Sequence, residues 1–239
     1  MEIGIIGFGQ FGQFAAKHLK EHFKVFAADK SDKSNEAEKL GVGFVSLAEA
    51  ASKDIVIMSV PINAFENILK QIKSHLKKGA LLIDVCSVKV KPAKAMQELV
   101  SKDIEVIATH PLFGPQSGAH GIKGLKIVVC ALRTSRLEQI KSILEKAGLQ
   151  VIIATPEEHD KQMAKTQTLA QFIGRALINM DIQQQNITTP SFGKLLELKD
   201  MLKEDSFELF RDIQKNNPFA EEVREEFCRE IKKIESELS

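Results

Sequence analysis

The chain has 239 residues, of which 33 are basic, 32 are acidic and 44% are hydrophobic. This composition is typical of a folded globular protein and excludes collagen-like, low-complexity and disordered chains. The balanced charge argues against a dedicated nucleic-acid-binding protein. No apolar run approaches the ~20 residues that a membrane-spanning helix needs, and the N-terminus shows no signal peptide, so we expect no membrane partner.

Cysteine usage and charge distribution add two expectations. Cys86, Cys130 and Cys228 are odd in number, far apart and without metal-ligand spacing, which predicts reduced thiols in a cytoplasmic protein and no metal site. From residue 156 onward there are 12 basic and 17 acidic residues, against 21 and 15 before it. The positive N-terminal part suits anionic ligands, although solvated lysines would give the same count.

Short β-branched runs alternate with amphipathic stretches up to about residue 154. We predict strands at residues 2–6, 24–28, 54–59, 80–84, 105–109, 126–131 and 150–154. We predict helices at residues 11–21, 64–76, 92–100 and 136–147. Such alternation indicates an α/β fold, a Rossmann-type doubly wound and mostly parallel sheet, which we assign to a dinucleotide-binding domain over residues 1–155.

The strand signal fades in residues 156–239, which we assign to a small all-helical domain. A first helix begins at Pro156 and extends to about Met180, with further helices at residues 192–202 and 206–215. We expect Asn217 to cap a last helix with Pro218 at its first position. That helix carries one apolar stripe: Phe219, Val223, Phe227, Ile231, Ile234 and Leu238. So short a domain cannot cover such stripes, which predicts a homodimer formed through residues after Pro156.

Residues 7–12, Gly-Phe-Gly-Gln-Phe-Gly, end an apolar strand and open a helix, and Asp29 follows 17 residues after Gly12. This is the dinucleotide fingerprint in its required context, although an ordinary glycine turn is the alternative. Asp29 favours NAD, whereas Lys30, Ser31 and Lys33 leave NADP possible. The expected cofactor contacts are Gly7, Phe8, Gly9, Gln10, Phe11, Gly12, Asp29, Lys30, Ser59, Val60 and Pro61.

Two polar segments follow strand ends, where ligands sit in doubly wound sheets. Residues 84–89, Asp-Val-Cys-Ser-Val-Lys, present Ser87 as a hydrogen-bonding group, or as a cap of the next helix. Residues 109–118, Thr-His-Pro-Leu-Phe-Gly-Pro-Gln-Ser-Gly, place His110 at a strand's end. Imidazole has the pKa of a general base for oxidation of an alcohol, although a lone histidine is more often structural.

These segments together resemble the prephenate/arogenate dehydrogenase family, and in particular its plant-type arogenate dehydrogenases. The motifs GIIGFGQFGQF, DVCSVKV and THPLFGPQSG carry the likeness, together with EEHDKQMAKTQ and DSFELFRDIQKNNPFA in the helical part. The resemblance implies NAD(P)-dependent oxidative decarboxylation of prephenate or arogenate in tyrosine biosynthesis. It implies His110 as the catalytic base, Ser87 as a contact of the substrate's ring hydroxyl, and a helical domain that dimerises and completes the substrate site.

The chain also departs from this family. Where many relatives use an arginine to hold a substrate carboxylate, Lys199 is the nearest candidate, and Arg211 lies further along. Gln171 stands in place of a histidine, and Gln116 in place of an acidic residue in the plant-type loop. We therefore expect Ser87, His110, Gln116 and Lys199 to bind substrate.

Two other functions stay open from the sequence. One is a β-hydroxyacid dehydrogenase or imine reductase, for which Lys165 is the candidate catalytic group. The other is a non-catalytic NAD-binding sensor, which would need neither His110 nor Ser87.

Overall fold

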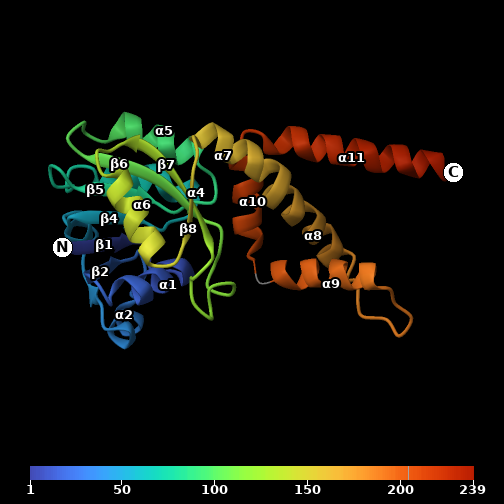
Figure 1. Ribbon diagram of the computed structural model, residues 1–239, viewed down its shortest axis with the longest axis horizontal. Helices are drawn as coiled ribbons and strands as arrows, with labels where there is room; N and C mark the ends of the chain where they lie inside the picture. Colours follow the sequence, from blue (N-terminus) through green and yellow to red (C-terminus); the bar gives the residue numbers. More distant parts are fainter. Residues whose placement is uncertain (204) are drawn as a thin grey trace. The chain divides into compact units, whose positions relative to one another are not determined.

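A computed structural model describes residues 1–203 and 205–239 of the chain. These residues form two compact units, Met1–Pro156 and Glu157–Ser239. The first unit holds all the strands of the described residues, and the second is helical (Figure 1).

One eight-stranded sheet runs through the first unit, in the order β3-β2-β1-β4-β5-β6-β7-β8. Its strands are β1 (Glu2–Ile6), β2 (Lys24–Ala28), β3 (Gly43–Phe44), β4 (Ile55–Met58), β5 (Leu81–Asp84), β6 (Glu105–Pro111), β7 (Lys126–Arg133) and β8 (Gln150–Ile153). All neighbouring strands are parallel except β6 and β7. The predicted doubly wound, mostly parallel sheet is confirmed.

Six helices accompany this sheet. They are α1 (Gln10–Leu19), α2 (Ser34–Leu40), α3 (Leu47–Ala51), α4 (Ile62–Ile72), α5 (Val90–Leu99) and α6 (Leu137–Lys146). Successive side chains of a strand point to opposite faces, so a strand buried on both faces is apolar throughout. In β4, Val56 and Met58 pack in one core cluster with Phe65 and Leu69 of α4, whereas Ile57 packs in another. Helices therefore cover both faces of the sheet.

The segment between β2 and β4 was not predicted to contain regular structure. It forms α2, β3 and α3, which have seven, two and five residues. Elements this short show no measurable periodicity. The local capping chemistry is nevertheless present in the sequence, because the Ser46 hydroxyl accepts the Glu49 backbone N–H at 3.2 Å and starts α3.

The second unit contains α7 (Pro156–Met163), the π-helical turn η1 (Ala164–Thr168), α8 (Leu169–Asn179), α9 (Pro190–Leu202), α10 (Phe207–Asn216) and α11 (Ala220–Glu237). The single helix expected up to Met180 is thus interrupted by η1. The last helix begins at Ala220 rather than at Pro218. Asn217 instead accepts the Phe219 backbone N–H at 2.9 Å, which makes a turn before the helix.

Two further observations concern the described residues as a whole. None of their helices is both long and apolar enough to cross a membrane. Nowhere in residues 1–203 and 205–239 do three or more His, Cys, Asp or Glu side chains gather as a metal would require.

Candidate functional site

The turn between β1 and α1 needs glycine at two of its three glycine positions. Gly7 has φ +93°, and a Cβ there would lie 2.1 Å from the Ser59 carbonyl oxygen. A Cβ on Gly12 would lie 2.1 Å from the Gly7 carbonyl oxygen. Around Gly9, by contrast, a Cβ would meet no atom within 4 Å. The first two positions hold the turn tightly against β4, and Gly9 leaves its outer side open to a ligand.

The N-terminus of α1 is suited to an anion. Gly9 is the N-cap and offers no side-chain hydrogen bond, and the first turn carries no acidic residue. Backbone N–H groups of a first helical turn lack acceptors within the helix and, with the helix dipole, favour negative charge. Gln10 is exposed and Phe11 is half-buried at this end. The arrangement could therefore receive a phosphate group.

Asp29, directly after β2, holds the backbone of two segments in addition to its expected role as a cofactor contact. Its carboxylate accepts the backbone N–H of Phe8 at 2.7 Å and that of Ser31 at 3.0 Å. Asp29 is half-buried and Lys30 is exposed. The Phe8 side chain is fully buried in the core, so only its backbone is placed to meet a cofactor.

The end of β4 lies beside this turn. The Ser59 backbone N–H donates to the Ile6 carbonyl oxygen at 2.7 Å, which joins it to β1. Val60 is half-buried, and Pro61 is exposed as the N-cap of α4. The structure thus brings the residues predicted from the ends of β1, β2 and β4 to one edge of the sheet.

The segment after β5 contains a buried ion pair that the sequence did not reveal. Asp84 and Lys89 are both fully buried, and the Lys89 ammonium donates to the Asp84 carboxylate and to the Thr109 carbonyl oxygen. Burial raises the pKa of the Asp84 carboxyl, while the Lys89 charge opposes that shift. Burial likewise raises the pKa of the neighbouring Cys86 thiol, so this thiol is inert.

Ser87 is half-buried and does not cap the next helix, because Lys89 is the N-cap of α5. The alternative of a capping serine is therefore wrong. Parallel pairing of β5 and β6 places Asp84 opposite Ala108. Ser87 follows Asp84 by three residues and His110 follows Ala108 by two, so both lie near the carboxyl ends of their strands, at the same edge of the sheet.

His110 is the last residue but one of β6 and is 4% exposed. It pairs with Val128 of β7 in antiparallel register. The preceding Thr109 donates its hydroxyl to the Asp84 carbonyl oxygen at 2.6 Å. The backbone carrying His110 is thereby fixed to the strand that leads to Ser87.

The loop after β6 packs on α1. The Phe113 ring lies 6.1 Å from the Phe14 ring, and a Cβ on Gly118 would lie 2.6 Å from Phe14 Cζ. Gln116 is exposed in this loop. A larger residue at position 118 would therefore have to displace the Phe14 ring of α1.

The second unit has its own polar cluster. Gln171 is 6% exposed and lines a small cavity together with Arg175, Leu202, Asp205 and Phe210. Arg175 donates to the Asp205 carbonyl oxygen at 3.1 Å. Burial raises the pKa of the Asp205 carboxyl, and the Gln171 hydrogen bond and the Arg175 charge oppose this.

The two cationic residues considered for the substrate carboxylate, Lys199 and Arg211, are not among the residues that line this cavity. The Lys199 ammonium donates to the Ile182 carbonyl oxygen, and Arg211 is exposed. Sequence reasoning missed Arg175, although it follows Gln171 by four residues and so shares its helix face.

Sheet order, glycine-rich turn and helix N-terminus define the first unit as a doubly wound, dinucleotide-binding type of fold. Comparison with known proteins identifies the family. Residues 15–153 match the family model described as prephenate dehydrogenase, nucleotide-binding domain, and residues 176–239 match one described as TYRAAT1-like, C-terminal domain. The chain belongs to the prephenate dehydrogenase family.

Two relatives show how far the likeness extends. A probable arogenate/prephenate dehydrogenase of Methanocaldococcus jannaschii is 34% identical over 97% of this chain and 55% of its own length. Arogenate dehydrogenase 2, chloroplastic, of Arabidopsis thaliana is 30% identical over 100% of this chain and 70% of its own length. The chain spans 55% and 39% of the first two curated relatives that it matches.

Solved structures share the fold. Prephenate dehydrogenase from Aquifex aeolicus, in complex with hydroxyphenyl propionate and NAD+, superposes with a TM-score of 0.80 at 24% identity, covering 99% of this chain and 90% of that one. Synechocystis arogenate dehydrogenase gives 0.75 at 19% identity, covering 99% and 91%. At these identities the superpositions establish the common architecture.

Proposed function

We propose that this chain catalyses the NAD-dependent oxidative decarboxylation of prephenate or arogenate. The observation that carries the proposal is the position of His110, at the same sheet edge as Ser87 in a nucleotide-binding domain of this family. A hydroxyl group bound at this edge would have a base and a hydrogen-bonding serine to meet it. Relatives named for prephenate and for arogenate make these the two candidate substrates.

In the proposed reaction His110 takes the proton of the ring hydroxyl at C4. NAD, when bound, supplies the acceptor for the hydride that leaves the same carbon. The ring carboxylate then leaves as carbon dioxide, and its bonding electrons make the ring aromatic. Ser87 would donate to or accept from the ring hydroxyl and orient it towards His110.

The residues present fit a dinucleotide. The open space at Gly9 allows a pyrophosphate to approach the backbone, and the N-terminus of α1 provides its N–H groups. Asp29 is partly exposed and can accept ribose hydroxyls while repelling a 2′-phosphate. The exposed Lys30 is the feature that leaves NADP possible.

For the substrate's remaining polar groups we propose Gln116 and Lys199. Gln116 is exposed on the loop after β6. An ammonium group has three donors, so the bond from Lys199 to the Ile182 carbonyl oxygen leaves two for a carboxylate.

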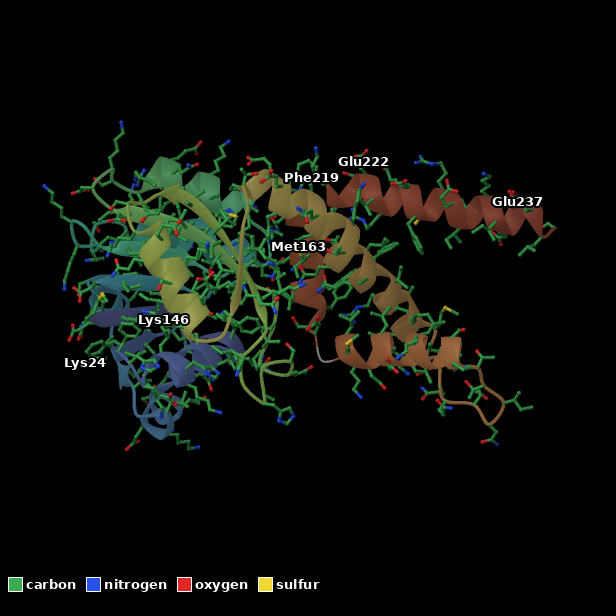
Figure 2. The ribbon with its side chains drawn as sticks, in the orientation of Figure 1. Lys24, Lys146, Met163, Phe219, Glu222 and Glu237 are labelled. Atoms are coloured by element: carbon green, nitrogen blue, oxygen red, sulfur yellow. The ribbon has the colours of Figure 1, made fainter. Side chains whose placement is uncertain are left out.

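We further propose a homodimer and a cytoplasmic location. Residues 228–239, which form the second half of α11 and the two residues after it, are all exposed. They include the apolar side chains of Ile231, Ile234 and Leu238. Figure 2 shows side chains projecting from the length of α11 between Glu222 and Glu237. A second copy of the chain would cover these apolar groups. The location rests on the three cysteines, between which no disulfide forms.

The rival functions have less support. Lys165, which a β-hydroxyacid dehydrogenase or imine reductase would use, is exposed on η1. A non-catalytic NAD sensor would need neither His110 nor Ser87 at this edge of the sheet. The experiment that separates these functions is a two-by-two assay of prephenate and arogenate with NAD and NADP, alongside a panel of hydroxy acids. Turnover of a hydroxy acid alone, or NAD binding without any turnover, would overturn the proposal.

A further inference from the structure

The buried ion pair of Asp84 and Lys89 joins the two segments that carry the proposed catalytic groups. Lys89 lies two residues after Ser87, and its ammonium reaches the carbonyl oxygen of Thr109, the residue before His110. Asp84 accepts the Lys89 ammonium and also the Cys86 backbone N–H at 2.9 Å on the same oxygen, Oδ1. The Thr109 hydroxyl closes the link through the Asp84 carbonyl oxygen.

Stability alone is a poor explanation for this pair. Both side chains are 0% exposed, and charges buried in this way are costly to desolvate. Apolar side chains of similar volume often give a fold that is equally stable. The second carboxylate oxygen, Asp84 Oδ2, has no hydrogen-bond partner among the described residues, so the pair is not fully satisfied.

The ion pair fixes the position of the two backbone segments relative to each other. A fully buried ammonium that bonds one carboxylate and one carbonyl has a fixed position, and it fixes the backbone of both segments with it. The Thr109 carbonyl is one peptide unit from the Cα of His110. A displacement of this carbonyl would therefore turn or shift the imidazole, and a misplacement of about 1 Å can cost about 10²-fold in rate.

We propose that Asp84 and Lys89 are positioning residues that hold His110 and Ser87 in a productive arrangement. The inference rests on the proposed function in that it assigns these two groups to the reaction. Neither Asp84 nor Lys89 touches the substrate in this proposal. They act through Thr109 and through the backbone between Cys86 and Lys89.

The test uses the full chain and the variant Asp84→Asn/Lys89→Met. Changing both residues removes the link between the segments without leaving one charge buried alone. Ile72→Ala is the control for lost stability, because Ile72 is fully buried at the end of α4. Thr109→Val is a second, milder variant that removes only the hydroxyl bond to Asp84.

Three quantities are measured on each variant: kcat with the better of the two substrates, the Kd of NAD by calorimetry, and the imidazole carbon signal of His110. The last comes from protein labelled with ¹³C-histidine and is assigned among the six histidines by its loss in His110→Asn. We expect the double variant to lose roughly 10–100-fold in kcat, to keep its NAD affinity within about twofold, and to shift the His110 signal. Ile72→Ala should lower the melting temperature while kcat and the signal stay unchanged.

A double variant with the kcat and the His110 signal of the unmodified protein would overturn the inference. So would a kcat loss in Ile72→Ala as large as in the double variant at a similar melting temperature. If the double variant does not fold, Thr109→Val provides the test. A loss in kcat of less than about 10-fold together with a shifted His110 signal supports the positioning role. An unchanged kcat and an unchanged His110 signal refute it. Should the unmodified protein turn over neither substrate, the proposed function fails, and the His110 signal alone then tests the positioning.

Discussion

The Asp29 carboxylate accepts the backbone N–H of Phe8 at 2.7 Å, so the residue expected to select the cofactor also holds the glycine-rich turn in place. The same carboxylate accepts the Ser31 N–H on its other oxygen. A substitution at this position therefore changes two properties together, cofactor preference and stability.

We expect Asp29→Ser to shift the ratio of kcat/KM from NAD towards NADP, because the charge that repels a 2′-phosphate is lost. A single hydroxyl cannot replace both carboxylate oxygens, so the free energy of unfolding should fall by about 1 kcal/mol. Lys30→Ala is the control: it removes an exposed ammonium and should weaken NADP use without changing the melting temperature. An unmodified enzyme with the higher kcat/KM for NADP would show that Lys30 and Lys33 decide the preference.

Gly9 and Gly12 form a matched pair for separating binding from folding. A Cβ at residue 12 would lie 2.1 Å from a backbone oxygen, whereas a Cβ at residue 9 would meet nothing within 4 Å. We expect Gly12→Ala to destabilise the fold by about 1–3 kcal/mol, as overpacking does. Gly9→Ala should keep the melting temperature and raise the Kd of NAD tenfold or more, since its methyl group occupies the ligand's side of the turn. Calorimetry and thermal unfolding check both, and equal stability losses would contradict the assignment.

The exposed apolar side chains of α11 lead to a prediction about assembly. If a second copy covers Ile231 and Ile234, then Ile234→Glu should give a monomer, because a charge cannot be buried in an apolar contact without cost. Lys233→Glu, one residue away on another side of the helix, should leave the dimer intact. Light scattering at micromolar concentration measures both. A monomeric mass for the unmodified chain would refute the prediction outright.

The parts of the fold that the sequence predicts are those with long, regular patterns. Runs such as Ile3–Ile6 are apolar on both faces, and the strands fall within one or two residues of their expected ends. The π-helical turn from Ala164 to Thr168 has no signal in hydrophobic periodicity, since it shifts the helix by a single residue. The two-residue β3 exists because Phe44 pairs with Ala27, a contact between distant positions.

Some residues of the candidate site can likewise be predicted from the sequence, and others cannot. Gly7, Gly9 and Gly12 follow from their spacing in the sequence. Close backbone contacts impose glycine at residues 7 and 12, whereas at residue 9 glycine leaves room for a ligand. The pair of Asp84 and Lys89 does not follow, because a lysine at a helix start is ordinarily solvated. Lys89 is buried in the folded chain, where its ammonium donates to Asp84 of β5 and to the Thr109 carbonyl oxygen of β6. The bond from Lys199 to Ile182 likewise depends on how the connection between α8 and α9 folds back.

His110 offers the most direct test of the mechanism. A base must be neutral, so kcat/KM should fall at acidic pH, where the imidazole of the free enzyme becomes protonated. His110→Asn can still hydrogen-bond to the substrate hydroxyl but cannot take its proton. We expect this variant to lose roughly 10²–10⁴-fold in kcat, the usual contribution of a positioned base, with the Kd of NAD unchanged.

Ser87→Ala is the matched comparison for that variant. It removes one hydrogen bond and some orientation, on the order of 1–2 kcal/mol, so its rate should fall less than that of His110→Asn. The acid limb of its pH profile should persist, because the base is still present, whereas the limb should vanish from the residual activity of His110→Asn. Near-normal turnover by a folded His110→Asn protein would mean that the histidine is structural. The base would then have to be another group at the edge where β5 and β6 end.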